Sequence, residues 1–344
     1  SHLQVARASP GLPVGPCIAI ANAARWAWMD SGQVAPFDCQ IVDEAFQLPD
    51  YRFQQIAGMA RRVVLVGDPG QIAPVITCEV ERWRCDPAGP QVACPRALLA
   101  RHPGIVRMSL PVSRRLVPDT VAIVQPAFYR HLTFTALSAP GARRLTTAIA
   151  GITPLDRAID RAQAGASIVQ VELPPRITGE ADGYLADTIV ALIERLFQRA
   201  AHLVDDGREQ PLTPEMVGVV CGHVSQVSAI VERLPRPLSE ILVETSDRFQ
   251  GLERPVMLVY HPLSGRADAD DFHLDAGRLC VMLSRHHVAC FVVSRGGLTD
   301  MLLRHAPSGD RILDVEEDGE FEGWRAHLSI LQSLKRQGRV VNIS

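Results

Sequence analysis

The stretch IVDEAFQ (41–47) runs from two β-branched residues directly into two adjacent carboxylates. A short apolar run of this kind is typical of a buried strand, and open α/β sheets bind their ligands at the carboxyl ends of the strands. Asp43 is therefore a candidate ligand for Mg²⁺, directly or through water. Glu44 is a candidate base that orients and deprotonates a water for attack on a phosphate. The alternative is a helix start, where acidic residues interact favourably with the helix dipole.

Downstream, VVLVGDPGQIAPV (63–75) predicts a second strand that ends at Gly67 and Asp68 and leads into a Pro-Gly turn. Gly67 and Gly70 let the backbone turn sharply, because glycine has no Cβ. Gln71, just after the turn, is placed to bond a terminal phosphate oxygen or the attacking water. The alternative is an ordinary turn from strand to loop that contacts no ligand.

The remainder of the chain alternates short apolar runs with helix-like patterns. This alternation predicts an α/β fold with parallel sheets that helices cover on both faces. We expect two domains, 1–104 and 105–344, because the segment 76–104 holds four prolines and three cysteines and interrupts the pattern. Residues 130–185 are rich in loop-forming residues and predict an insertion in the second domain.

The composition is that of a globular protein, with 47% hydrophobic and 21% charged residues. The net charge of -3 does not by itself indicate nucleic-acid binding, although local basic stretches could line a groove. The eight cysteines are scattered without a CxxC pair, which is typical of a reducing cytosol. A zinc site at Cys78, Cys85 and Cys94 is conceivable, but their spacing is irregular. No apolar run reaches the roughly 18 residues of a membrane span, so we predict a soluble, cytoplasmic protein.

The order of the motifs resembles that of the superfamily 1 helicases. IVDEAFQ and VVLVGDPGQIAPV are similar to helicase motifs II and III. LPVSRRLVP (110–118) resembles motif IV, VETSDRFQGLERPVMLV (243–259) resembles motif V, and RLCVMLSRHHVACFVV (278–293) resembles motif VI. Five motifs in the family's order are far more specific than any one of them. The order and the string QGLE resemble the branch that contains the nonsense-decay helicase and helicase-nuclease fusions.

The resemblance covers about residues 17–295, and the chain departs from the family at several of its positions. Arg114 stands where the family usually has an aromatic residue, which puts adenine or sugar contacts in doubt. Ser284 replaces the usual threonine, and Cys280 replaces a common asparagine. His286 and His287 replace a small residue and a basic one.

The resemblance implies two RecA-like P-loop domains with parallel sheets, the first of them incomplete, and ATP with Mg²⁺ bound in the cleft between them. Arg115 and Arg285 correspond to arginine fingers, whose planar guanidinium pairs bidentately with phosphate oxygens. For each of them the alternative is a surface or ion-paired arginine. Glu253 would accept a hydrogen bond from the ribose, and Gly251 would permit close backbone approach. The remaining nucleotide contacts that the resemblance implies are Gln47, Gly67 and Asp68.

The partner implied by the resemblance is single-stranded DNA or RNA, held mostly through its phosphates. Thr245 and Gln250 in motif V are candidates for this contact. His223 and Gln226 in GHVSQV resemble a segment from strand to helix that touches the nucleic-acid backbone in related proteins. The alternative for His223 is an ordinary loop histidine.

The phosphate-binding motif G-x-x-x-x-G-K-[ST] does not occur, because Lys335 is the only lysine and LQSLKRQG is no phosphate loop. One explanation is that the chain is part of a longer protein whose loop lies upstream. The other is a degenerate relative that binds nucleic acid or a partner without hydrolysis. The set Asp43, Glu44, Gln71 and Arg285 favours the first explanation. On this interpretation the fragment alone binds nucleotide weakly, if at all.

We therefore expect the complete protein to be an ATP-dependent nucleic-acid translocase or helicase. Two rival hypotheses remain. The first is a non-hydrolysing module that binds nucleic acid or a protein partner. The second is a P-loop ATPase that acts as a switch with protein partners in a larger repair or defence assembly.

Overall fold

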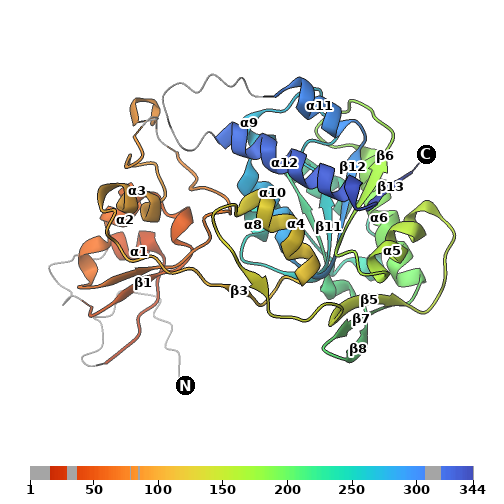
Figure 1. The fold of residues 1–344 in the computed structure, drawn as a ribbon, viewed down its shortest axis with the longest axis horizontal. Helices are drawn as coiled ribbons and strands as arrows, with labels where there is room; N and C mark the ends of the chain where they lie inside the picture. Colours follow the sequence, from red (N-terminus) through yellow and green to blue (C-terminus); the bar gives the residue numbers. More distant parts are fainter. Residues whose placement is uncertain (1–15, 29–36, 78, 84–85, 307–318, 344) are drawn as a thin grey trace. The chain divides into compact units, whose positions relative to one another are not determined.

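The computed structural model describes residues 16–28, 37–77, 79–83, 86–306 and 319–343 (Figure 1). Contacts between Cα atoms divide the chain into two compact units. The first unit consists of Ser1–Pro69 and Ala73–Val106, and the second of Gly70–Ile72 and Arg107–Ser344. Cys78 and Cys85, two of the three cysteines weighed for a zinc site, lie outside the described residues.

The first unit pairs two parallel strands, β1 (Gln40–Val42) and β2 (Val63–Leu65), with Gln40 opposite Val63. Its helical segments are α1 (Ala23–Ala27), η1 (Ala45–Gln47), α2 (Asp50–Gln54), η2 (Ala57–Met59), η3 (Glu81–Trp83) and α3 (Cys94–Arg101). A small core lies beneath them, formed by Ala45, Phe53, Ile56, Met59 and Cys94.

The apolar side chains of β1 and β2 are not buried as their pattern predicts. Ile41 is 70% exposed and Val64 is 47% exposed. A strand buries both faces only when helices or a second sheet cover both of them. Within the described residues of this unit the helices form a single small core, so the expectation of buried strands is wrong here.

The second unit is built on a parallel sheet, which confirms the predicted α/β class. Among the described residues this sheet has six strands in the order β10-β9-β11-β12-β6-β13. Their bounds are β6 (Ile168–Leu173), β9 (Val217–Cys221), β10 (Leu242–Thr245), β11 (Arg254–Tyr260), β12 (His286–Arg295) and β13 (Val340–Asn342).

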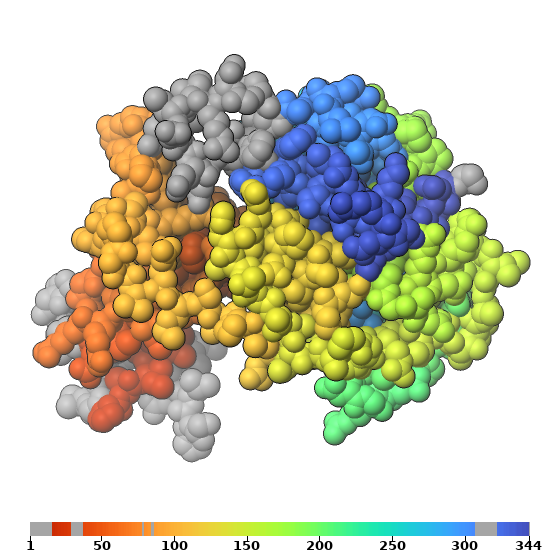
Figure 2. Space-filling view, viewed as in Figure 1, coloured from red at the N-terminus to blue at the C-terminus, as the bar shows by residue number. Residues whose placement is uncertain are grey.

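Helices cover both faces of this sheet. Along β9, β11 and β12, alternate residues enter two separate apolar clusters, as the period of two in a strand requires. One face packs against α5 (Pro154–Gln163), α6 (Gly183–Gln198) and α7 (Val224–Val231). The other packs against α4 (Pro118–Phe128), α10 (Ala276–Ser284) and α12 (Gly319–Arg336). In Figures 1 and 2, α4 and α12 lie side by side on that face.

The smaller elements complete the unit. Three antiparallel strands form a second sheet, β5 (Arg143–Thr147), β7 (Ala201–Asp205) and β8 (Arg208–Pro211). Two short strands, β3 (Val112–Ser113) and β4 (Thr135–Ala136), pair in parallel. The other helical segments are η4 (Pro214–Met216), η5 (Arg236–Leu238), α8 (Ser246–Phe249), α9 (Asp271–Leu274) and α11 (Leu298–Arg304). In the described part of the chain, no helix combines the length and the apolar character that a membrane crossing requires.

The expected insertion near 130–185 holds part of the main sheet. Within it, β6 lies between β12 and β13, and its residues Ile168, Val169 and Val171 are fully buried. The interpretation of this segment as an insertion is therefore wrong for β6. The reason is that a six-residue strand between loop-forming residues gives only a weak local signal, whereas its pairing partner β12 is far away in the sequence.

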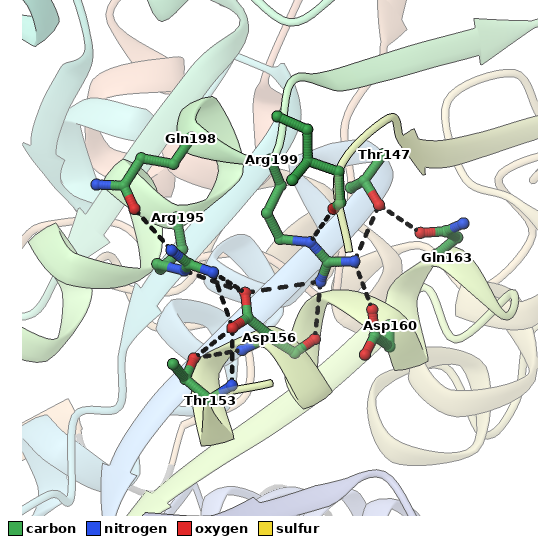
Figure 3. Close-up of polar contacts among 9 residues, drawn as sticks. Thr147, Thr153, Asp156, Asp160, Gln163, Arg195, Gln198 and Arg199 are labelled. Atoms are coloured by element: carbon green, nitrogen blue, oxygen red, sulfur yellow. Dashed lines mark hydrogen bonds and ion pairs between the residues drawn. The ribbon is translucent and has the colours of Figure 1, made fainter. Parts of the chain in front are cut away.

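An ion pair built on a buried carboxylate ties α5 to α6 (Figure 3). The carboxylate of Asp156 is fully buried and lies 2.8 Å from Nη2 of Arg195. Burial works to raise the pKa of Asp156, but hydrogen bonds from Thr153 and the charge of Arg195 lower it to about 2. Arg199 reaches the main-chain oxygen of Asp156 at 3.1 Å and the carboxylate of Asp160 at 2.7 Å. This network fixes the two helices on one face of the sheet.

Candidate functional site

The carboxylates of IVDEAFQ lie directly after β1, as a strand-end site requires. Asp43 is exposed, and its Oδ1 accepts a hydrogen bond from the backbone N–H of Glu44 at 3.0 Å. Glu44 has φ 51° and ψ 41°, in the left-handed region. A residue with a side chain is strained there by about 1–2 kcal/mol, and such strain concentrates at functional sites.

The neighbouring strand ends beside this turn. The N–H of Ala45 donates to the carbonyl of Val66 at 2.8 Å, so the two strand exits are joined. A Cβ on Gly67 would lie 3.0 Å from the backbone nitrogen of Ala45, a very tight contact, so glycine here favours the close approach of the two segments. Gln47 and Asp68 are half-buried on the same two segments. The first unit thus holds the predicted set Asp43, Glu44, Gln47, Gly67 and Asp68 at the carboxyl ends of β1 and β2.

In the second unit, the segments of motifs IV, V and VI meet at one carboxylate. Nη1 of Arg115 lies 3.7 Å from Oε2 of Glu253, and Nε2 of His287 lies 3.3 Å from Oε1 of the same residue. Burial lowers the pKa of His287, against the opposing attraction of Glu253. The chain thereby brings Arg115 and Glu253, which are far apart in the sequence, into one cluster.

Arg285 is 2% exposed and ends α10. Its carbonyl accepts a hydrogen bond from the N–H of Arg254 at 3.0 Å, which fastens motif VI to the start of β11. The structure therefore places this candidate arginine finger inside the second unit, next to β12.

Several buried polar atoms of this region have no hydrogen-bond partner among the described residues. They are Nε of Arg115, Oγ of Ser284 and Nδ1 of His286. Ser284 is 2% exposed and His286 is fully buried. Leaving such an atom unsatisfied costs about 1–3 kcal/mol, and native proteins contain few of them. Because these atoms lie on motifs IV and VI, this region is a candidate binding site for a polar ligand.

The motif III glutamine contacts motif V within the second unit. Nε2 of Gln250 donates to Oε1 of Gln71 at 3.3 Å. A Cβ on Gly277 would lie 2.6 Å from the main-chain carbon of Gln71, so α10 packs directly on this loop. Gly251, next to Gln250, has φ +80°, which favours glycine. Thr245 ends β10 and precedes α8.

His223 is the N-cap residue of α7, and Gln226 lies in the first turn of that helix. Gln226 is 3% exposed, and its Oε1 accepts hydrogen bonds from the N–H groups of Gly222 and His223 at 3.0 and 3.2 Å. Its Nε2 donates to the carbonyl of Glu180 at 2.8 Å. The structure gives Gln226 a capping role, and the nucleic-acid contact expected of it stays a prediction.

Side chains that the sequence did not single out surround His223. Its ring stacks on Phe272 with centroids 4.9 Å apart, and its Nε2 lies 2.7 Å from Nε2 of His273. On Phe272 also lies the guanidinium of Arg278, 4.0 Å from the ring centroid. Phe272 and His273 belong to the short helix α9 and stand in no motif, so only their position after β11 could have indicated them.

Residues 180–296 match the family model of an AAA domain. The matched segment runs from the loop before α6 to the end of β12, so it contains motifs V and VI. The match assigns an AAA domain to the part of the chain that carries the resemblance to motifs V and VI. No curated protein matches the chain.

Among solved structures, the chain is similar to the helicase of PRRSV, with 13% identity and a TM-score of 0.39 over 82% of this chain and 41% of that one. It is also similar to the arterivirus nonstructural protein 10 helicase in complex with DNA, with 14% identity and a TM-score of 0.35 over 78% and 41% of the two chains. A third similar structure is the C-terminal domain of a possible DNA helicase from Lactobacillus plantarum, with 11% identity and a TM-score of 0.28 over 43% and 88%. The chain spans 41% of the length of each viral helicase.

Proposed function

We propose that the chain is part of an ATP-dependent nucleic-acid translocase or helicase. The observation that carries this proposal is the cluster of Arg115, Glu253 and His287, together with the unsatisfied polar atoms on the same motifs. A nucleotide offers phosphate oxygens to the arginines and ribose hydroxyls to Glu253. The match of residues 180–296 to an AAA domain supports a nucleotide as the ligand.

The catalytic roles follow from the chemistry of phosphoryl transfer, in which the transition state spreads negative charge over the transferred group. Arg115 and Arg285 supply positive charge to it. Glu44 orients and deprotonates the attacking water, and Gln71 contacts that water or a terminal phosphate oxygen.

The residues present fit a Mg²⁺ ion. Mg²⁺ in nucleotide sites is held by one or two carboxylates in addition to phosphates and waters. Asp43 is exposed, and one of its oxygens is held by the N–H of Glu44, so the other can face the ion. When bound, the ion neutralises phosphate charge.

Single-stranded DNA or RNA is the proposed partner, with Thr245, Gln250, His223 and Gln226 as the contacting residues. In support, Thr245 is the last residue of β10, and His223 follows shortly after the end of the neighbouring parallel strand β9. Backbone and side-chain donors at one sheet edge suit a phosphate backbone.

The arginine roles are tested in the full-length protein by ATP hydrolysis with single-stranded DNA or RNA present. We expect Arg115→Ala and Arg285→Ala each to lower kcat by roughly 10³-fold, the smaller effect known for arginine fingers. Arg208→Ala, on the exposed strand β8, is the matched control and should leave kcat unchanged. Equal rates for all three variants would refute the assigned roles.

A second candidate function is nucleic-acid or partner binding without hydrolysis, because the sequence contains no G-x-x-x-x-G-K-[ST]. It predicts that the full-length protein binds single strands equally well with and without ATP and does not consume ATP. A strand-displacement assay then separates a switch-type ATPase from a helicase.

A further inference from the structure

A series of buried hydrogen bonds in the second unit starts at His286, the residue that follows Arg285 of motif VI. Nε2 of His286 lies 2.8 Å from Oγ1 of Thr120, which lies 2.8 Å from Oγ of Ser167. The Ser167 hydroxyl donates to Oδ2 of Asp119 at 2.6 Å. Arg339 pairs bidentately with Asp119, at 2.6 and 2.5 Å. His286 and Thr120 are fully buried, and Ser167 is 3% exposed.

The direction of every bond follows from the carboxylate. Burial works to raise the pKa of Asp119, but the bonds from Arg339 and Ser167 outweigh it, so the net pKa lies below its ordinary value. The carboxylate is therefore ionised and accepts only. Ser167 gives its one proton to Asp119, and Thr120 gives its one proton to Ser167. Only His286 remains to donate in the contact with Thr120.

His286 is thereby fixed as the tautomer that carries its proton on Nε2. Its Nδ1 is then an acceptor, and this atom has no hydrogen-bond partner among the described residues. Burial, with Arg115 and His287 nearby, lowers the pKa of His286 to about 3, which agrees with a neutral ring.

This chain of bonds joins the two segments that carry the candidate arginines. His286 follows Arg285 directly and begins β12, and Thr120 lies in the first turn of α4, just after the turn that holds Arg115. The bond between His286 and Thr120 therefore sets the distance between the two segments. Asp119 and Ser167 anchor the same turn to β6, and Arg339 anchors it to the segment before β13.

We propose that neutral His286, hydrogen-bonded through Nε2 to Thr120, is a positioning residue that holds Arg115 and Arg285 in register for phosphoryl transfer. This inference rests on the proposed ATPase function. A neutral donor is required, because a third positive charge beside two buried or half-buried arginines would be strongly unfavourable. The geometry of the arginines matters because displacement of a catalytic group by about 1 Å can cost 10²-fold in rate.

The test compares matched substitutions in the full-length protein. Thr120→Val removes the hydroxyl at nearly constant shape, whereas Thr120→Ser keeps it. His286→Leu removes the donor, and His286→Gln keeps an N–H donor near the position of Nε2. For Thr120→Val and His286→Leu we expect kcat to fall roughly tenfold, with KM for ATP changed less than about twofold. Thr120→Ser and His286→Gln should recover kcat to within about threefold.

A purely structural role predicts a different pattern, in which melting temperatures fall and kcat per folded molecule stays constant. Constant kcat in Thr120→Val, or equal losses in Thr120→Val and Thr120→Ser, would overturn the proposal.

A second measurement does not depend on ATPase activity. Long-range ¹H–¹⁵N spectra of the 344-residue chain should show His286 protonated on Nε2 and bare on Nδ1. The side-chain N–H signals of Arg115 and Arg285 should shift in Thr120→Val and not in Thr120→Ser. A proton on Nδ1 of His286 would refute the positioning role, and so would side-chain N–H signals of Arg115 and Arg285 that do not change in Thr120→Val. Absence of ATPase activity in the wild type, with these spectra as expected, would refute the proposed function alone.

Discussion

Glu44 carries both of the properties expected of a functional residue, a reactive side chain and a strained backbone. Its φ of 51° lies where side chains are disfavoured, yet it stands between an exposed carboxylate and a tight 3-10 turn. Proteins retain such strain where the local geometry serves function at the expense of stability.

Glu44→Gly therefore should stabilise the protein by about 0.5–1 kcal/mol, because glycine adopts this conformation without a Cβ clash. The same substitution should abolish ATP hydrolysis by the full-length protein. Urea unfolding measures the first effect, and Glu44→Gln is the control that removes the carboxylate and keeps the strain. A loss of stability in Glu44→Gly would show that the left-handed turn is not the source of strain.

At the scale of elements, the sequence was sufficient for the alternation of strands and helices in the second unit, because β9, β11 and β12 are nearly continuous apolar runs. It was insufficient for β6, whose place depends on pairing with β12. The motif residues were found from order and spacing, and the structure brings Arg115 and Glu253 together. Thr120, Ser167 and Phe272 were missed, because tertiary contacts and no local pattern define their roles.

The ion pair between α5 and α6 gives a second stability prediction. Asp156→Asn removes a fully buried carboxylate whose charge faces Arg195, which is 28% exposed, and Arg199, which is 4% exposed. We expect a loss of about 1.5–3 kcal/mol in the free energy of unfolding, as for hydrogen bonds to a charged group. Asp187→Asn is the control, because its 62% exposed carboxylate pairs with the 34% exposed Arg233, and it should cost less than about 1 kcal/mol. Similar losses for both variants in urea unfolding would show that burial does not set the strength of the pair.

At the scale of the whole molecule, buried histidines make stability depend on pH. Burial lowers the pKa of His286 and of His327 to about 3, well below the value of about 6.5 in an unfolded chain. Burial also holds the pKa of His261 well below its ordinary value. Below about pH 6.5 these histidines are protonated in the unfolded state but remain neutral in the folded state. The free energy of unfolding is therefore highest above about pH 6.5 and decreases as the pH falls.

The free energy of unfolding should fall by about 1.4 kcal/mol for each pH unit and each buried histidine between about pH 6 and pH 3. Unfolding by urea at a series of pH values measures it. Glutamine keeps a donor and cannot be protonated in this range. In His286→Gln the dependence of the free energy of unfolding on pH should therefore be smaller by the contribution of one histidine, about 1.4 kcal/mol per pH unit. An unchanged slope in this variant would mean that His286 is not neutral and buried in the folded protein.

The central proposal is that the full-length protein is a nucleic-acid-dependent ATPase. The most direct measurement is the rate of ATP hydrolysis by the full-length protein, with and without single-stranded DNA or RNA and with Mg²⁺ present. We expect the rate to rise at least about tenfold when the single strand is added, because in the proposed mechanism strand binding closes the catalytic groups around the phosphates. No hydrolysis under either condition, from a folded protein that binds single strands, would contradict it.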